Sequence, residues 1–146
     1  MIYTPLTVRA MQIAYKAHHG TTDANGVPYV FHPYHIAEQM TDEYTTCVAL
    51  LHDVVEDTEV TLKQLSEEFP AEVVDAVALM TRDKNVPYEE YIRRIKGNAL
   101  ALTVKLQDIA HNMDETRIVY PDAVSEERRS HWREKYAIAL KILLNN

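Results

Sequence analysis

The chain has 146 residues, 47% of them hydrophobic, and a formal net charge of −7. This length and composition predict one domain, residues 1–146, with room for a buried core. The acidic balance argues against a nucleic-acid polymer as partner, and no apolar run is long enough to predict a membrane span. With a single cysteine, Cys47, the chain cannot form an internal disulfide, and it shows no signal-peptide pattern. Both features favour a cytoplasmic location.

Start signals predict helices from the first residues onward. Thr4-Pro5 supplies a cap and a first-position proline for a helix that runs to about residue 19. Residues 20–31, with Asn25-Gly26 near their middle, predict a loop that contains at most a short hairpin. His32-Pro33 then restarts a helix, with His32 expected at the cap and Pro33 at the first helical position.

The rest of the chain also lacks convincing strand alternation, so the predicted fold class is all-α. The remaining helices are predicted by their start signals: Asp42 for the helix that carries His52-Asp53, Thr61 for a capping box, Pro70 for a helix to Met80, Pro87 for residues 88–96, Asn98 for a long helix to about residue 115, and Ser125 for the last helix.

Residues 50–58, Leu-Leu-His-Asp-Val-Val-Glu-Asp-Thr, combine an apolar helical face with a strongly polar one. On a helix of about 100° per residue, His52, Asp53, Glu56 and Asp57 share one side, while the apolar side chains fill the other. Three carboxylates this close repel one another unless a cation or protons intervene. The segment therefore predicts a divalent metal site.

A second polar stripe lies on the long helix that follows Asn98. Lys105, Asp108 and Asn112 align there beside an apolar arc. An aspartate in this setting is costly to bury unless it is paired or metal-bound, so Asp108 is either a metal ligand or the partner of a nearby basic residue. His32 is a fourth candidate ligand, because a proline-started helix fixes its backbone; its alternative role is a helix cap.

These segments together resemble the hydrolase domain of the RelA/SpoT alarmone enzymes and of their small single-domain relatives, members of the HD phosphohydrolase superfamily. The resemblance covers roughly residues 5–115, and its HDxxEDT segment is the most specific part. The matching segments are Ala17-His18, Gly26-Val27-Pro28-Tyr29, His32-Pro33, Ala49 to Thr58, Leu79 to Arg82, Val104 to Asp108 and His111-Asn112-Met113.

The resemblance implies an HD-type helical bundle with a metal site between its helices and one bound ion, usually manganese. In such enzymes Glu56 and Asp57 would orient or deprotonate the attacking water, and Asn112 would approach the nucleotide. The family reaction removes pyrophosphate from the 3′ position of a guanosine tetra- or pentaphosphate. The ligand types suit Mn²⁺, Fe and Zn alike. The ligands that the resemblance implies are His32, His52, Asp53 and Asp108.

The chain departs from the family where cations usually read the substrate. Asp23-Ala24 stands in place of an Arg-Lys pair, Ile109 in place of an arginine, and Asp114-Glu115 in place of Arg-Thr. Losing cations beside a polyphosphate costs charge-assisted contacts. Two alternatives to an alarmone hydrolase therefore stay open: a hydrolase for another nucleotide or cofactor phosphate, and a non-catalytic module that binds metal or nucleotide.

Three further residues are candidates for contact with the substrate. Arg82 and Lys105 could meet phosphates, although each could also be an ordinary solvated charge. Tyr29, beside the His32 loop, could line the pocket or pack in the core. The last helix, around Trp132 and Tyr136, packs either within the monomer or at a homodimer interface.

Overall fold

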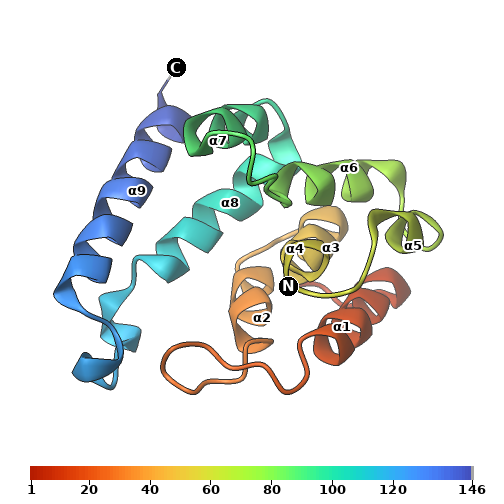
Figure 1. Cartoon of the computed structure of the whole chain (residues 1–146). Coiled ribbons are helices and arrows are strands. Elements are labelled where there is room, and N and C mark those ends of the chain that lie inside the picture. The colour runs from red at the N-terminus through yellow and green to blue at the C-terminus, as the bar shows by residue number, and fades with distance from the viewer. Residues whose placement is uncertain (146) are drawn as a thin grey trace.

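The computed structural model describes residues 1–145 of the protein, and its regular structure is helical (Figure 1). The all-α prediction is therefore confirmed for the described part of the chain. In the 20–31 loop the extended pairing consists of an isolated antiparallel bridge between Thr22 and Pro28. The elements are α1 (Pro5–Ala17), α2 (Phe31–Glu38), α3 (Glu43–Leu51), α4 (Val54–Asp57), α5 (Leu62–Ser66), α6 (Ala71–Met80), α7 (Tyr88–Lys96), α8 (Ala99–Asn112), the 3₁₀ turns η1 (Glu115–Arg117) and η2 (Pro121–Ala123), and α9 (Glu126–Leu144).

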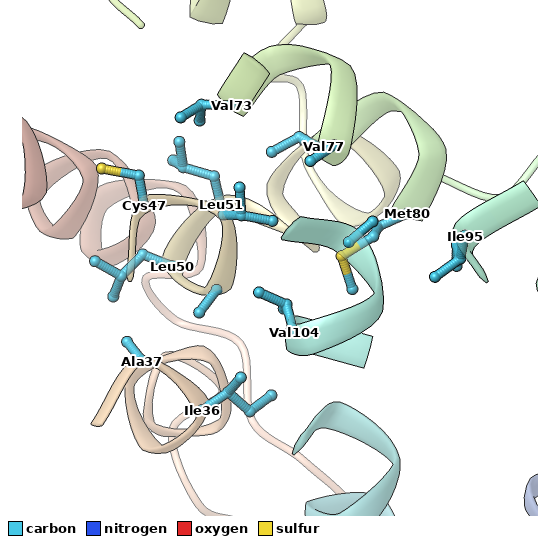
Figure 2. Close-up of a cluster of buried hydrophobic side chains, with 14 of the residues drawn as sticks. Ile36, Ala37, Cys47, Leu50, Leu51, Val73, Val77, Met80, Ile95 and Val104 are labelled. Carbon is cyan, nitrogen blue, oxygen red and sulfur yellow. The ribbon is translucent and has the colours of Figure 1, made fainter. Parts of the chain in front are cut away.

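Helix α3 is the centre of the packing. It contacts α1, α2, α6 and α8, and every one of its residues from Thr45 to Leu51 is buried. Figure 2 shows how Leu50 and Leu51 face side chains of neighbouring helices, with Ile36 on one side and Val77 on another. Replacing a buried leucine by alanine typically lowers the free energy of unfolding by about 2–5 kcal/mol, so these contacts hold α3 firmly against its neighbours.

Most predicted helix starts are confirmed by their hydrogen bonds. Side-chain oxygens accept bonds from backbone amides at the cap positions of α1, α3, α5, α8 and α9, as the sequence predicts. Two of these, at Thr4 and Thr61, are reciprocal capping boxes. Helix α8 ends at Asn112, a few residues before the expected end, because the chain turns into η1.

The predicted start of the second helix is wrong by two residues. Helix α2 begins at Phe31 after Val30, which makes no side-chain cap, so His32 lies inside the first turn rather than at the cap. The amides of Phe31 and His32 donate to the carbonyls of Pro28 and Tyr29, which starts the turn early. Pro33 fits there because first-turn residues need no intrahelical amide bond.

The continuous helix predicted through residues 50–58 is also wrong. Helix α3 ends at Leu51, α4 begins at Val54, and His52 and Asp53 form the junction between them. The Ala49 carbonyl, which a continuing helix would offer to the Asp53 amide, accepts a bond of 2.6 Å from His52 Nδ1. Since Asp53 has φ −105° and ψ −6°, the regular angular spacing of the helix does not apply across the junction.

Helix α9 lies along the edge of the bundle beside α8, and it packs against α7 and α8 (Figure 1). Tyr136 packs against the core, and Arg133 pairs with both Glu115 and Glu126, which ties η1 to the last helix. Among residues 1–145, no helix combines the length and apolarity that a bilayer crossing requires. The single-domain and homodimer hypotheses stay predictions.

Candidate metal centre

The four predicted metal ligands converge on one point, although they come from three parts of the fold. Helix α2 supplies His32, the junction after α3 supplies His52 and Asp53, and α8 supplies Asp108. His32 Nε2 lies 3.0 Å from Asp108 Oδ1 and 3.7 Å from Asp53 Oδ2. His52 Nε2 lies 3.1 Å from Asp53 Oδ2 and 3.6 Å from Asp108 Oδ1. Each imidazole nitrogen thus faces an oxygen of both carboxylates.

The donor atoms fit a divalent cation. His52 Nε2 is buried and makes no hydrogen bond of acceptable geometry, even though two carboxylate oxygens are close to it. The other ring nitrogen of His52 donates to Ala49, so the neutral ring would present a lone pair at Nε2. Two imidazoles with two carboxylates form a ligand set for a first-row divalent metal. A nitrogen left unsatisfied among oxygens is the arrangement expected around a shared ion.

Without an ion, the imidazoles and a lysine balance the carboxylate charges. Burial opposes ionisation of Asp108, but the ammonium of Lys105 and the rings of His32 and His52 hold its pKa well below the usual range. Asp53 behaves alike, with a pKa lowered to about 2 by His52 against the effect of burial. The same pairs raise the pKa of His52 well above its usual range despite burial. A cation that binds here would therefore displace protons.

Hydrogen-bond partners hold three of the predicted ligands, His32, Asp53 and Asp108, in place. Such partners fix the orientation and tautomer of metal ligands. His111 was not found by the sequence analysis as a member of this set, although its position three residues after Asp108 places it on the same helix face. The contacts are Tyr29 Oη to Asp53 Oδ2 at 2.6 Å, His111 Nδ1 to His32 Nδ1 at 2.7 Å, Lys105 Nζ to Asp108 Oδ2 at 2.8 Å, and Asn112 Nδ2 to Asp108 Oδ1 at 3.1 Å.

Glu56 and Asp57 lie at the open edge of the centre. Both are exposed on α4, and each offers an oxygen that lies within 4.8 Å of an Asp53 oxygen. Glu56 Oε1 accepts a bond of 2.7 Å from the backbone amide of Arg82, which fixes that carboxylate. Partial burial, followed by the charges of Asp53 and Glu56, raises the pKa of Asp57 to about 6. A carboxylate with this pKa is a good proton acceptor near neutral pH.

Two of the residues predicted to contact the substrate already have partners within the fold. Lys105 is buried and its ammonium is paired with Asp108, and its contact with a phosphate stays a prediction. The Tyr29 ring lies between His18 and His32, and its hydroxyl donates to the predicted ligand Asp53; its contact with a substrate stays a prediction. Asn112 lies beside Asp108, and its contact with a nucleotide stays a prediction.

The acidic replacement in the 20–31 loop has a local structural role. Asp23 Oδ1 accepts bonds from the amides of Asn25 and Val27, and Oδ2 lies 3.4 Å from the guanidinium of Arg117. Arg117 in turn donates to the His111 carbonyl at 2.8 Å. This aspartate therefore connects the loop to the end of α8, a function that an Arg-Lys pair could not perform.

The helical fold, with two imidazoles and two carboxylates gathered between its helices, places the described residues in the class of helical domains built around a metal site. The HD domain family matches residues 10–120, so this chain belongs to that family, which confirms the resemblance drawn from the motifs. Its HD pair is His52-Asp53 at the α3–α4 junction.

Several relatives carry a named activity. The chain is 36% identical over 125 residues to a guanosine-3′,5′-bis(diphosphate) 3′-pyrophosphohydrolase of Haemophilus influenzae, with 75% of this chain and 18% of that protein covered. A human relative, guanosine-3′,5′-bis(diphosphate) 3′-pyrophosphohydrolase MESH1, is 35% identical over 130 residues, with 82% and 73% covered. The chain spans about a fifth of the length of the first of these relatives.

A solved structure has the same fold. It is described as a metazoan ortholog of SpoT that hydrolyzes ppGpp and plays a role in starvation responses. The TM-score is 0.82 at 25% sequence identity, and the match covers 99% of this chain and 89% of that one.

Proposed function

We propose that this protein is a metal-dependent phosphohydrolase that removes pyrophosphate from the 3′ position of a guanosine tetra- or pentaphosphate, with Mn²⁺ as its ion. The convergence of His32, His52, Asp53 and Asp108 is the observation that carries the proposal. The names of the relatives from Haemophilus influenzae and human support the choice of substrate.

Those four residues would hold the ion in this proposal. When bound, a divalent cation neutralises charge on the phosphoryl oxygens and makes a nearby water more acidic. Lys105 and Tyr29 act as positioning residues, because each donates a hydrogen bond to a ligand carboxylate. Lys105 binds Asp108 Oδ2, and Tyr29 binds Asp53 Oδ2. The protein supplies orientation, and the cation supplies the positive charge.

Glu56 and Asp57 perform the proton chemistry in this proposal. The water oxygen attacks phosphorus, the bond from phosphorus to O3′ breaks, and pyrophosphate leaves while O3′ takes up a proton from solvent water. Asp57 accepts the proton of the attacking water, because its carboxylate is the one whose pKa is raised towards neutrality. Glu56, held by the Arg82 amide, orients the same water.

The test compares hydrolysis of several substrates under identical metal conditions. Purified protein is stripped of metal, reloaded with Mn²⁺, and incubated with guanosine tetraphosphate, with 2′- and 3′-phosphorylated cofactors, and with a simple phosphomonoester. We expect pyrophosphate release from the first compound and a fall of about 100-fold or more in Asp57→Asn. If no compound releases phosphate or pyrophosphate, a binding module without turnover is the better description.

Two comparisons refine the proposal. Preference for a phosphorylated cofactor over guanosine tetraphosphate would keep the mechanism and change the substrate, as the Asp23 contacts in the loop would allow. Reloading with Fe²⁺, Zn²⁺ or Mg²⁺ in place of Mn²⁺ tests the metal. We expect Mn²⁺ to give the highest rate, and a clearly higher rate with another ion would overturn that part.

A further inference from the structure

Two cationic side chains, Arg82 in the loop after α6 and Lys135 on helix α9, lie near the metal centre. The guanidinium carbon of Arg82 lies 5.1 Å from the centre of the Tyr88 ring, and Lys135 Nζ lies 4.7 Å from the same ring centre. Lys135 also lies 5.5 Å from the ring centre of Tyr136. Two positive groups thus share one aromatic ring, each in the range of a cation–π contact.

These two cations lack a counter-anion within the described residues. Lys105, the third cation of this region, is paired with Asp108, whereas neither Arg82 nor Lys135 has a carboxylate within 4.0 Å in residues 1–145. Arg82 Nε and the Tyr88 hydroxyl are buried and make no hydrogen bond there. Glu56 is bonded to the Arg82 amide, not to its guanidinium. Unpaired donors beside like charges are costly unless an anion joins them.

Lys135 interacts electrostatically with charged groups of the metal centre and its surroundings. Burial lowers the pKa of Lys135, and the positive charges of Lys105 and Arg82 lower it further. The carboxylates of Asp108 and Glu56 act in the opposite direction. Lys135 is therefore close enough to both the metal ligands and the water-orienting carboxylate for their charges to act on it.

The placement adjoins the reacting groups. The Arg82 amide lies 2.7 Å from Glu56, and Lys105, bound to the ligand Asp108, lies 5.4 Å from the ring centre of Tyr91, the neighbour of Tyr88. Helix α9 reaches this region because it lies beside α8 (Figure 1). An anion held between Arg82 and Lys135 would thus extend from the metal centre rather than form a separate surface site.

We propose that Arg82 and Lys135, both within cation–π range of the Tyr88 ring, form an oxyanion subsite that binds the terminal phosphate of a diphosphate group. The guanidinium supplies a planar pair of donors, and the ammonium supplies a point charge. The Tyr88 hydroxyl adds a neutral donor. That this phosphate belongs to the leaving pyrophosphate rests on the proposed function; the affinity for a diphosphate anion does not.

Calorimetric titration of the metal-free protein with inorganic pyrophosphate tests the subsite without any turnover. We expect Arg82→Met and Lys135→Met each to weaken pyrophosphate binding about tenfold or more, because each removes a charge-assisted contact. Lys141→Met is the matched control, since Lys141 is an exposed lysine on the same helix, and it should bind as the unchanged protein does. Lys135→Arg keeps the charge and should retain most of the affinity.

Far-UV circular dichroism establishes that each variant is folded before its affinity is compared. No binding by the unchanged protein, or equal binding by the methionine variants and the Lys141 control, overturns the subsite. If pyrophosphate binding depends on Arg82 and Lys135 while guanosine tetraphosphate is not hydrolysed, the subsite stands and the proposed function fails. If guanosine tetraphosphate is hydrolysed but pyrophosphate binding does not change in either methionine variant, the proposed function stands and the subsite fails.

Discussion

The Tyr29 hydroxyl donates a hydrogen bond of 2.6 Å to Asp53 Oδ2 and so joins the 20–31 loop to the candidate metal centre. Burial, followed by the charge of Asp53, raises the pKa of Tyr29 well above its usual value, so the hydroxyl stays a donor. We expect Tyr29→Phe to weaken Mn²⁺ binding about tenfold, the usual effect of losing a partner of a metal ligand. Calorimetric titration with Mn²⁺ measures this affinity.

The control for that titration is Tyr15→Phe, which removes the hydroxyl of an exposed tyrosine on α1. Its Mn²⁺ affinity should equal that of the unchanged protein. Equal affinities for Tyr29→Phe and Tyr15→Phe would show that the Tyr29 bond does not position Asp53 for a metal.

Lys105 should matter most when no metal is bound. Its ammonium lies 2.8 Å from Asp108 Oδ2, and both side chains are buried. In Lys105→Met the carboxylate loses this partner, so we expect the metal-free protein to lose about 3 kcal/mol of its free energy of unfolding in urea. Mn²⁺ should restore part of the loss, because the cation replaces the missing positive charge.

The matched control for this measurement is Lys63→Met, at an exposed lysine on α5. Substitutions of exposed residues away from special contacts change stability by about 0.5 kcal/mol or less. A loss in Lys105→Met that is no larger than in this control, or that Mn²⁺ does not reduce, would contradict the role given to the pair.

His111 should set the tautomer of His32. Their Nδ1 atoms lie 2.7 Å apart, and burial, with the nearby charge of Arg117, lowers the pKa of His111 to about 4. Neutral His111 can therefore accept the Nδ1 proton of His32, which leaves His32 Nε2 free to bind a cation. We expect His111→Phe to weaken Mn²⁺ binding about tenfold and to change the ¹⁵N chemical shifts of the His32 ring at neutral pH.

His131→Phe is the control, because His131 is exposed on α9. It should alter neither the His32 ring signals nor the metal affinity. Unchanged His32 signals in His111→Phe would mean that another group holds the tautomer.

Helix boundaries were predictable where a side chain signals them locally. Asp42 and Ser125 cap their helices by bonding to an amide three residues later, a pattern visible in the sequence. The break at His52-Asp53 was not predictable from periodicity, because it coincides with a ring nitrogen that bonds the Ala49 carbonyl in an otherwise helical segment. The break turns the side chains of His52 and Asp53 towards a common point. On a continuous helix these two neighbouring side chains would point about 100° apart.

The candidate site was predictable to the extent that its residues lie in local patterns. Asp108 was predicted as either a metal ligand or the partner of a nearby basic residue. The structure has both its approach to the histidines and a pair with Lys105, three residues earlier on the helix. Lys135 lies in a different helix from either, and only the packing of α9 against α7 and α8 brings it near them. Sequence spacing contains no information on such a contact.

Cys47 provides a test of the core that does not involve the metal centre. Its thiol is fully buried in α3, and burial, with a smaller effect of the Glu43 carboxylate, raises its pKa to about 12. Since only the thiolate reacts, a disulfide reagent at about pH 8 should modify the native protein about 100-fold or more slowly than protein unfolded in guanidinium chloride.

Above about pH 9 the unfolded chain releases the thiol proton of Cys47 while the folded chain keeps it, so the free energy of unfolding should fall as pH rises towards about 12. Cys47→Ala should lack that alkaline component, and native modification as fast as in the unfolded chain would show that α3 is not buried as described.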